Sequence, residues 1–273
     1  MMKKNVLILL FAVCFAFAVF PCGVQAGSNP TVYVGDTDVT PAEMEVTYYW
    51  QAAESGDNAY AATGSEHDYL FSVTYHDSTG ITLTLNGVDI TSFSNQDYGS
   101  INYATGIYSN WRFNLVLQGE NTIDNSGIAC GVGLYEGGLK ISGSGSLSIP
   151  QSSYGIYANG SGLMISGGTI DISAEISGIW ANSDLSISGG TVNISVVHFA
   201  LSSNGGELSI SGGNVNISSD NICVSVTGDM SISGGVVTAC AGHALFLAEN
   251  LTVPVAYKYK AALTAADPGG NYT

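Results

Sequence analysis

The chain has 273 residues, with 22 acidic and 6 basic side chains and a formal net charge of −16. A surface this negative repels phosphate backbones and anionic lipid, which excludes nucleic acid as an expected partner. Cations and neutral molecules such as sugars remain compatible with it.

Residues 1–26 have the features of a secretory signal peptide. Lys3 and Lys4 precede an apolar run of 15 residues at 6–20, and a small-residue cleavage site follows at 24–26. That run is shorter than the roughly 20 residues a membrane span requires. We expect export and no membrane insertion after cleavage, with lipid attachment at Cys22 as an alternative that fits the preceding residues poorly. The mature chain would carry a charge of 4 − 22 = −18.

Residues 27–80 contain strand-forming segments, TVYV, VTYYW and YLFSVTY, but no repeat. The bare end of a stacked sheet would attract further strands. We therefore predict that 27–80 forms an N-terminal β cap over the domain that follows.

Residues 81–250 repeat one phrase with a period of 22 to 24 residues. The clear copies are LKISGSGSLSI at 139–149, LMISGGTIDIS at 163–173, LSISGGTVNIS at 185–195, LSISGGNVNIS at 208–218 and MSISGGVVTAC at 230–240. Looser copies at 83–90 and 115–123 bring the number of units to seven. A fixed period of this length is typical of a solenoid.

Within the copy at 185–195, apolar residues alternate with polar ones, which indicates strand. The Gly-Gly pair permits a sharp bend, and a third short run (GIYS, GIYA, GIWA) completes a triangular coil. A leucine-rich repeat has a similar period but needs a helical segment that this pattern lacks. The prediction is an all-β, right-handed parallel β-helix of about seven coils. Residues 251–273 would form a C-terminal cap or begin a further, truncated segment.

Residues able to carry catalysis are sparse in the coils. Sugar hydrolysis generally needs two carboxylates flanking one bond, and the coils carry their acids singly. A β-eliminating lyase needs a basic group, for which only Arg112 and Lys140 are available within the coils. His198 and His243 are interpreted as surface residues. Cys130, Cys223 and Cys240 are expected to be small buried side chains, with any disulfide between Cys223 and Cys240 left open.

One set of residues in the third run suggests a binding surface. Each follows the expected buried aliphatic residue of its unit: Tyr108, Tyr135, Tyr157 and Trp180, continued by Ser202, Ser225 and Phe246. Alternation predicts that they point outward, one above another, as an exposed platform for sugar rings. The alternative is that stacked aromatic residues only stabilise neighbouring strands. Two polar rows should also align and face solvent: Thr169, Thr191 and Asn214, and Asp171, Asn193 and Asn216.

The repeated LSISGGTVNIS phrase, followed by GIYA or GIWA, resembles a family of secreted bacterial β-helix proteins described as carbohydrate-binding or adhesin-like, common in clostridia and other anaerobes. The resemblance covers roughly residues 31–260 and extends to TVYVGDTDVT at 31–40. It implies non-catalytic binding of plant cell-wall or cell-surface polysaccharide. It also implies calcium held by acidic residues before the GI segment, where this chain keeps only Asp220.

These observations predict a secreted, monomeric, non-catalytic polysaccharide-binding protein at or near the cell surface. Tyr108, Tyr135, Tyr157 and Trp180 are the expected carbohydrate-binding residues. A polysaccharide lyase or glycoside hydrolase, and a structural adhesin that binds protein, are the alternatives.

Overall fold

The computed structural model describes residues 30–52, 60–63, 66, 69–76, 78–97, 102–124 and 129–253. The predicted signal peptide and residues 254–273 of the predicted C-terminal segment lie outside these ranges. All the regular secondary structure in the described ranges is β-strand. No helix in this part of the chain is long and apolar enough to cross a membrane.

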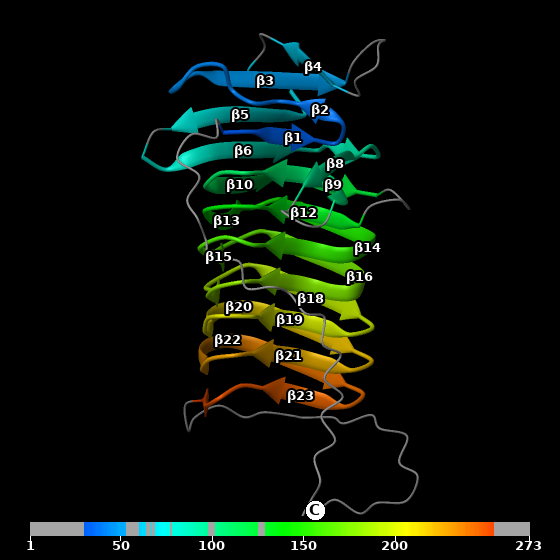
Figure 1. The fold of residues 1–273 in the computed structure, drawn as a ribbon, viewed down its shortest axis with the longest axis vertical. Helices are drawn as coiled ribbons and strands as arrows, with labels where there is room; N and C mark the ends of the chain where they lie inside the picture. Colours follow the sequence, from blue (N-terminus) through cyan, green and yellow to red (C-terminus); the bar gives the residue numbers. More distant parts are fainter. Residues whose placement is uncertain are drawn as a thin grey trace, which may run out of the picture.

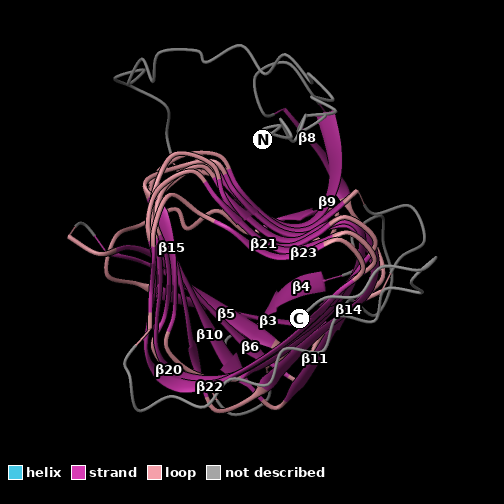
Figure 2. Ribbon diagram, turned by 90° about the horizontal axis from the view of Figure 1, so that it is seen from below, coloured by secondary structure: helices cyan, strands magenta, loops and turns pink. Residues whose placement is uncertain are grey.

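The strands stack into a three-sided prism whose long axis runs from the N-terminal to the C-terminal end (Figures 1 and 2). Figure 2 looks along this axis from the C-terminal end. The chain runs counter-clockwise around the three faces while it advances towards the viewer, which makes the coil right-handed. The predicted right-handed parallel β-helix is confirmed.

The first face begins each coil. It contains β6 (Gly80–Asn86), β10 (Phe113–Gln118), β13 (Gly138–Gly143), β15 (Gly162–Ile165), β17 (Leu185–Ile187), the first parts of β20 (Leu208–Ser219) and β22 (Met230–Ala241), and β24 (Leu251–Thr252). Since β24 pairs in parallel with β22, residues 251–252 continue the coil instead of capping it.

The second face follows a corner in each coil. It contains β7 (Asp89–Ile90), β11 (Glu120–Ile123), the first parts of β14 (Ser146–Ala158) and β16 (Thr169–Ala181), β18 (Thr191–Val196), and the last parts of β20 and β22.

The third face completes each coil. It contains β9 (Asn102–Ser109), β12 (Cys130–Leu134), the last parts of β14 and β16, β19 (Phe199–Ser203), β21 (Ile222–Val226) and β23 (Ala244–Leu247). Among the described residues it has seven strands, so the chain makes six turns between β9 and β23.

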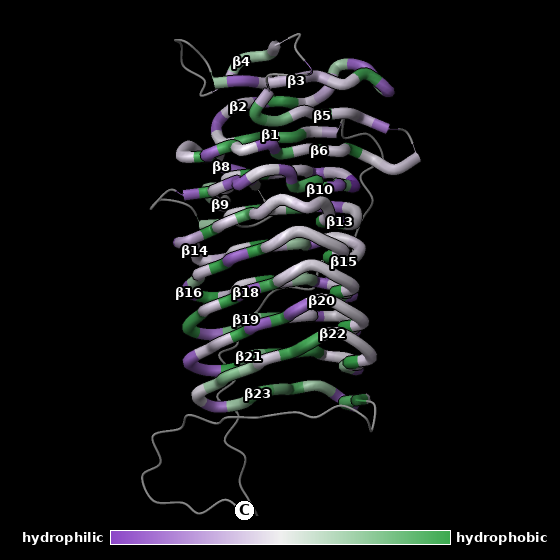
Figure 3. Tube along the Cα trace, turned by 180° about the vertical axis from the view of Figure 1, so that it is seen from behind, coloured by the Kyte–Doolittle hydropathy of each residue, from purple (hydrophilic) through white to green (hydrophobic). Residues whose placement is uncertain are grey.

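The core is built from apolar side chains that stack on their equivalents in the next coil. The isoleucine row of the first face is fully in register and at most 7% exposed: Ile141, Ile165, Ile187, Ile210 and Ile232. The predicted inward residues of the copy at 185–195 are also buried (Leu185, Ile187, Val192 and Ile194). Figure 3 shows the resulting mixture of apolar and polar residues along each coil.

The corner between the first and second faces explains the Gly-Gly pair. The second glycine of each clear ISGG copy has a φ close to +80°: Gly168, Gly190, Gly213 and Gly235. L-residues with a side chain rarely adopt this conformation. A Cβ on Gly190 would also lie 2.5 Å from the carbonyl oxygen of Gly168. Both backbone conformation and stacking distance therefore require glycine.

The N-terminal strands cover the first coil with antiparallel pairs. β1 (Val32–Val34) pairs with β9, and it also forms a hairpin with β2 (Thr37–Asp38). β5 (Phe71–His76) pairs with β6 and with β3 (Thr47–Ala52), which in turn pairs with β4 (Tyr60–Thr63). The bare edges of β6 and β9 are thereby closed, as the need to protect a sheet edge predicts.

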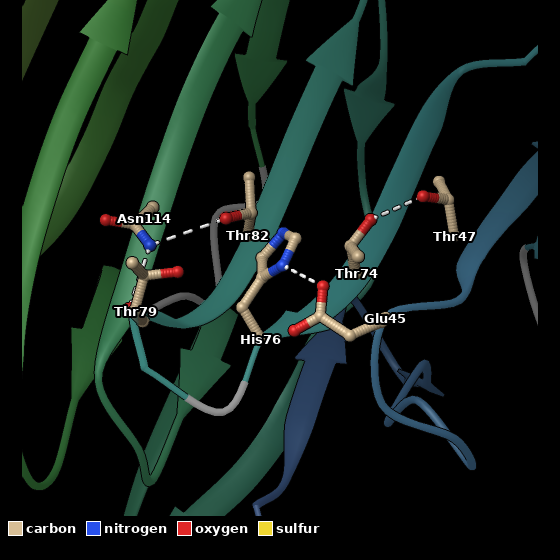
Figure 4. A network of polar contacts seen from close by, with 7 residues as sticks. All are labelled: Glu45, Thr47, Thr74, His76, Thr79, Thr82 and Asn114. Carbon is tan, nitrogen blue, oxygen red and sulfur yellow. Dashed lines mark hydrogen bonds and ion pairs between the residues drawn. The ribbon is translucent and has the colours of Figure 1, made fainter.

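Polar side chains form contacts within this cap and between the first two strands of the first face (Figure 4). The hydroxyls of Thr47 and Thr74 are 2.8 Å apart, and Asn114 Nδ2 donates to Thr82 Oγ1 at 3.4 Å. His76 Nδ1 lies 2.8 Å from Glu45 Oε2.

Candidate carbohydrate-binding faces

The outward row of the third face differs from the predicted one. Val132, and not Leu134, pairs with the core residues Ile107 and Ile156. The row is therefore Tyr108, Gly133, Tyr157, Trp180, Ser202, Ser225 and Leu247. The prediction that Tyr135 and Phe246 belong to this row is wrong.

Tyr135 occupies the corner after the strand instead. Its backbone N–H donates to the carbonyl oxygen of Ser109 at 2.9 Å, as the N–H of Asn159 does to that of Leu134 in the next coil. The interval of 27 residues between Tyr108 and Tyr135 reflects this shift by two positions, since Tyr108 and its true counterpart Gly133 are 25 residues apart. Tyr135 remains partly exposed beside the face.

The expected exposed platform is also largely covered. Tyr108 is 6% exposed and lies opposite Tyr33 of the antiparallel strand β1. Tyr157 is 9% exposed, because neighbouring rings pack over it. Trp180 is partly exposed, so Trp180 and Tyr135 are the two predicted site residues whose rings a ligand could reach.

Four rings form a compact group on this face, which we call the aromatic cluster: Tyr103, Tyr154, Tyr157 and Trp180. Tyr154 contacts the other three, with ring centroids 5.5 Å from Tyr157, 5.7 Å from Tyr103 and 6.4 Å from Trp180. The Tyr154 and Trp180 planes are perpendicular. Edge-to-face pairs of this kind are favourable beyond the area they bury, so the cluster is held rigidly.

The β8–β9 hairpin brings Tyr103 to the cluster. β8 (Ser94–Asp97) pairs antiparallel with the first half of β9, and Figure 2 shows this hairpin standing out from the third face. Tyr103 and Tyr154 were not predicted as site residues. Tyr154 precedes Tyr157 by three residues, and Tyr103 lies in a hairpin that the repeat does not contain, so neither position follows from the period alone.

Burial sets the protonation of the cluster. It raises the pKa of Tyr157 to about 12 and also raises the pKa values of Tyr103 and Tyr154. Cys130 is fully buried against these rings, and its thiol donates to the carbonyl oxygen of Val132 at 3.3 Å. The three phenols remain neutral hydrogen-bonding groups at physiological pH.

Asparagine side chains orient the indole. Trp180 Nε1 donates to Asn182 Oδ1 at 2.8 Å, and Asn182 Nδ2 donates to Asn159 Oδ1 in the preceding coil. Both asparagines occupy the corner position that follows the third face. The arrangement places amide groups beside a partly exposed indole. This combination suits a ligand whose ring has apolar faces and carries hydroxyl groups at its edge.

The second face carries a different kind of surface. Asn193 Nδ2 donates to Asp171 Oδ1 at 2.6 Å, and Asn216 Nδ2 donates to Asn193 Oδ1 at 2.9 Å. The predicted alignment of these residues is confirmed. Two shallow depressions of about 470 and 380 Å³ lie along this row and at the corner with the third face, and they share Pro150, Ser173 and Ser195.

Asp220 lines the smaller depression together with Glu175. Calcium takes six to eight oxygen ligands, commonly several of them carboxylate. Among the described residues no group of three or more His, Cys, Asp or Glu side chains could hold a metal ion. The side chains around Asp220 therefore do not fit a carboxylate-rich calcium site.

Cys130, Cys223 and Cys240, the cysteines of the described ranges, are not joined in disulfides. Cys130 and Cys223 are fully buried, as expected, whereas Cys240 is partly exposed. Burial raises the pKa of Cys223 to about 11, and its thiol donates to the carbonyl oxygen of Cys240 at 2.8 Å.

Searches among curated proteins and among solved structures found no match. A family described as carbohydrate-binding domain-containing protein matches residues 51–250, which include β4 and β5 of the cap, all seven strands of the third face and the aromatic cluster. The chain therefore belongs to this family of carbohydrate-binding domain proteins.

Proposed function

We propose that the protein is a secreted, non-catalytic polysaccharide-binding β-helix, and that the aromatic cluster contacts the sugar through the exposed part of Trp180. The observation that carries this proposal is the position of Trp180, a partly exposed indole with fixed ring contacts and a fixed hydrogen bond. Family membership supports the ligand class, and the basic, apolar and small-residue pattern of residues 1–26 supports export. The ligand would be a plant cell-wall or cell-surface glycan bound by a monomer.

Rigidity favours binding here. Trp180 packs perpendicular to Tyr154, and its Nε1 is hydrogen-bonded to Asn182. A side chain that is already ordered loses little conformational entropy when a ligand docks on it. A sugar ring could stack on the indole while its hydroxyls meet the amides of Asn159 and Asn182.

The chemistry of the cluster supports binding more than catalysis. Its three phenols are poor proton acceptors at neutral pH, because burial raises the tyrosine pKa values and keeps them protonated. On the first face, Arg112 donates through Nη1 to the carbonyl oxygen of Ser78 at 2.6 Å and is therefore already engaged. Calcium is not part of this proposal, and its effect on binding is an experimental variable.

The test compares Trp180→Ala with Trp180→Phe and the parent on a glycan array and in polysaccharide pull-down, with and without calcium. Trp180→Ala should weaken binding by roughly tenfold or more, because aromatic side chains dominate such interfaces. Trp180→Phe keeps a ring and should retain part of the affinity. Circular dichroism and urea unfolding would verify that both variants fold.

Equal binding by all three proteins would disprove the role of Trp180. Release of reducing or unsaturated ends from bound pectin or glucan would favour the hydrolase or lyase alternative. Retention by a protein partner, without binding to any glycan, would favour the adhesin alternative.

A further inference from the structure

A groove crosses several coils on the second face and at its corner with the third face. The two depressions on the second face share three residues, so they form one surface, which we call the ladder groove. Its lining extends from Ser148 in β14 to Thr238 in β22 and therefore spans five successive coils. The groove runs along the helix axis, perpendicular to the strands.

The floor of the ladder groove repeats one kind of group in each coil. Ser148, Asp171, Asn193, Asn216 and Thr238 are in register on adjacent strands. Strands stack about 4.8 Å apart, close to the length of one sugar residue in an extended β-linked chain. A polysaccharide lying along the axis would meet one polar side chain per sugar.

Hydrogen bonds along the row fix Asp171, Asn193 and Asn216 before any ligand arrives. Asn193 donates one hydrogen bond and accepts another within the row. Each amide nitrogen has two hydrogens and each carbonyl oxygen two lone pairs. The remaining hydrogen-bonding capacity faces outward in a fixed orientation, which suits sugar hydroxyl and amino groups.

At its corner with the third face, the groove contains two carboxylates without an ion pair and one hydroxyl without a hydrogen bond to any described residue. Glu175 and Asp220 are exposed carboxylates that form no ion pair with any described residue. Ser152 lines the same depression, is 7% exposed, and its Oγ has no hydrogen-bond partner among the described residues. A buried hydroxyl without a partner is costly, and a bound polar group could satisfy it.

The charge of the groove limits which class of sugar it can bind. The described ranges contain only two Lys or Arg residues, Arg112 and Lys140, and neither lines the groove. The groove contains the carboxylates of Asp171, Glu175 and Asp220. A chain of uronic acids or sulfated sugars would be repelled, whereas protonated amines would be attracted.

We infer that the ladder groove binds an extended polysaccharide that carries free amino groups, of the glucosamine type, aligned with the helix axis at one sugar per coil. The inference rests on the proposed carbohydrate-binding function, but it places this ligand on a different face from Trp180. Ammonium groups pair with Glu175 and Asp220, and hydroxyls bond to the ladder amides.

The experiment titrates the intact mature protein with a glucosamine oligomer and with the matching N-acetylated oligomer by calorimetry. The variant Glu175→Gln with Asp220→Asn removes two charges from the groove. The variant Glu207→Gln with Glu249→Gln removes two exposed charges from the corner between the third and first faces, as a matched control. Both pairs keep the shape of the side chains.

The groove variant should bind the glucosamine oligomer about fivefold to tenfold more weakly, as expected for two exposed ion pairs, with a smaller salt dependence. The control variant should bind it like the parent. The parent should bind the N-acetylated oligomer several times more weakly, since acetylation removes the positive charge.

If the groove variant and the control variant lost affinity for the glucosamine oligomer equally, the binding would reflect general attraction to an acidic protein, and the inference would be overturned. Equal affinity for the two oligomers, or no binding of either, would also overturn it. Loss of the glucosamine oligomer in Trp180→Ala alone would move the site to the aromatic cluster and leave the proposed function intact. A glycan array without any bound sugar would instead contradict the proposed function itself.

Discussion

The second and third faces are built by the same coils, yet their outer surfaces follow the repeat to different degrees. On the second face, Asp171, Asn193 and Asn216 lie in register and hydrogen-bond from one coil to the next. On the third face, the outward row changes from tyrosine to glycine, tyrosine, tryptophan and serine in successive coils.

The inner sides of both faces are alike. Ile172 and Ile194 on the second face and Ile179 and Leu201 on the third stack in register and are at most 3% exposed. Stacking in the core and the glycine corners impose the period, whereas an outward side chain need only avoid its neighbours. Where the outward residues of successive coils are alike, the row forms a ladder of hydrogen bonds along the axis. Where they vary from coil to coil, the row forms a local site. The aromatic cluster is of the second kind.

The corner glycines should be the most sensitive positions, because every face depends on them. Gly190→Val would place a β-branched residue at a φ of +80° with its Cβ 2.5 Å from a carbonyl oxygen of the preceding coil. We expect a loss of about 3 kcal/mol or more in the free energy of unfolding, from backbone strain and steric clash together. Urea denaturation followed by circular dichroism measures it.

Gly138→Ala is the matched control. No positive φ occurs at this glycine, and the nearest atom to an added Cβ is 3.6 Å away. Its free energy of unfolding should change by no more than about 0.5 kcal/mol. Similar effects of the two substitutions would show that the corner does not determine coil stability.

The contrast between the faces also explains how far the sequence predicts this molecule. The LSISGG phrase contains both the inward apolar residues and the corner glycines, so the β-helix and the row of Asp171, Asn193 and Asn216 follow from the period. The handedness follows from the general right-handedness of parallel crossover connections. The first coils depart from that period. Gly133, and not Tyr135, continues the outward row, because Gly131-Val132-Gly133 is the counterpart of Gly106-Ile107-Tyr108.

Coverage of the aromatic row could not be predicted from spacing either. Tyr108 is buried because β1 pairs with β9, and Tyr157 because Tyr103 reaches it from the β8–β9 hairpin. Both contacts come from segments outside the repeat. Alternation correctly predicts that a side chain points away from the core, but only the packing of non-repeating segments decides whether solvent reaches it.

A smaller effect should follow from interrupting the ladder on the second face. Asn193→Ala removes the hydrogen bonds to Asp171 and from Asn216. For partly exposed groups we expect a loss of about 1 kcal/mol in the free energy of unfolding. Asn214→Ala in the neighbouring row should change it by no more than about 0.5 kcal/mol, because the exposed Asn214 side chain has no hydrogen bond to a described residue. If Asn193→Ala proved as neutral as Asn214→Ala, the ladder would not stabilise the fold.

An effect of similar size should appear on the third face, as a dependence of stability on alkaline pH. Burial raises the pKa of Tyr157 to about 12 in the folded protein, whereas an unfolded tyrosine has a pKa of about 10. Below about pH 10 the phenol is neutral in both states, and its contribution to stability is fully present. Between about pH 10 and 12 the unfolded state loses its proton first, so the free energy of unfolding falls as the pH rises.

Tyr157→Phe removes this ionisation. For each protein, the free energy of unfolding is compared between about pH 9 and about pH 11. The decrease over this range should be smaller by roughly 1 kcal/mol in the variant than in the parent. The decline should become shallower without disappearing, because burial also raises the pKa values of Tyr103 and Tyr154. Urea denaturation across this pH range, with phenolate absorbance recorded in parallel, measures both quantities. Identical pH profiles for parent and variant would mean that Tyr157 is open to water, and the third face would then offer a second exposed ring beside Trp180.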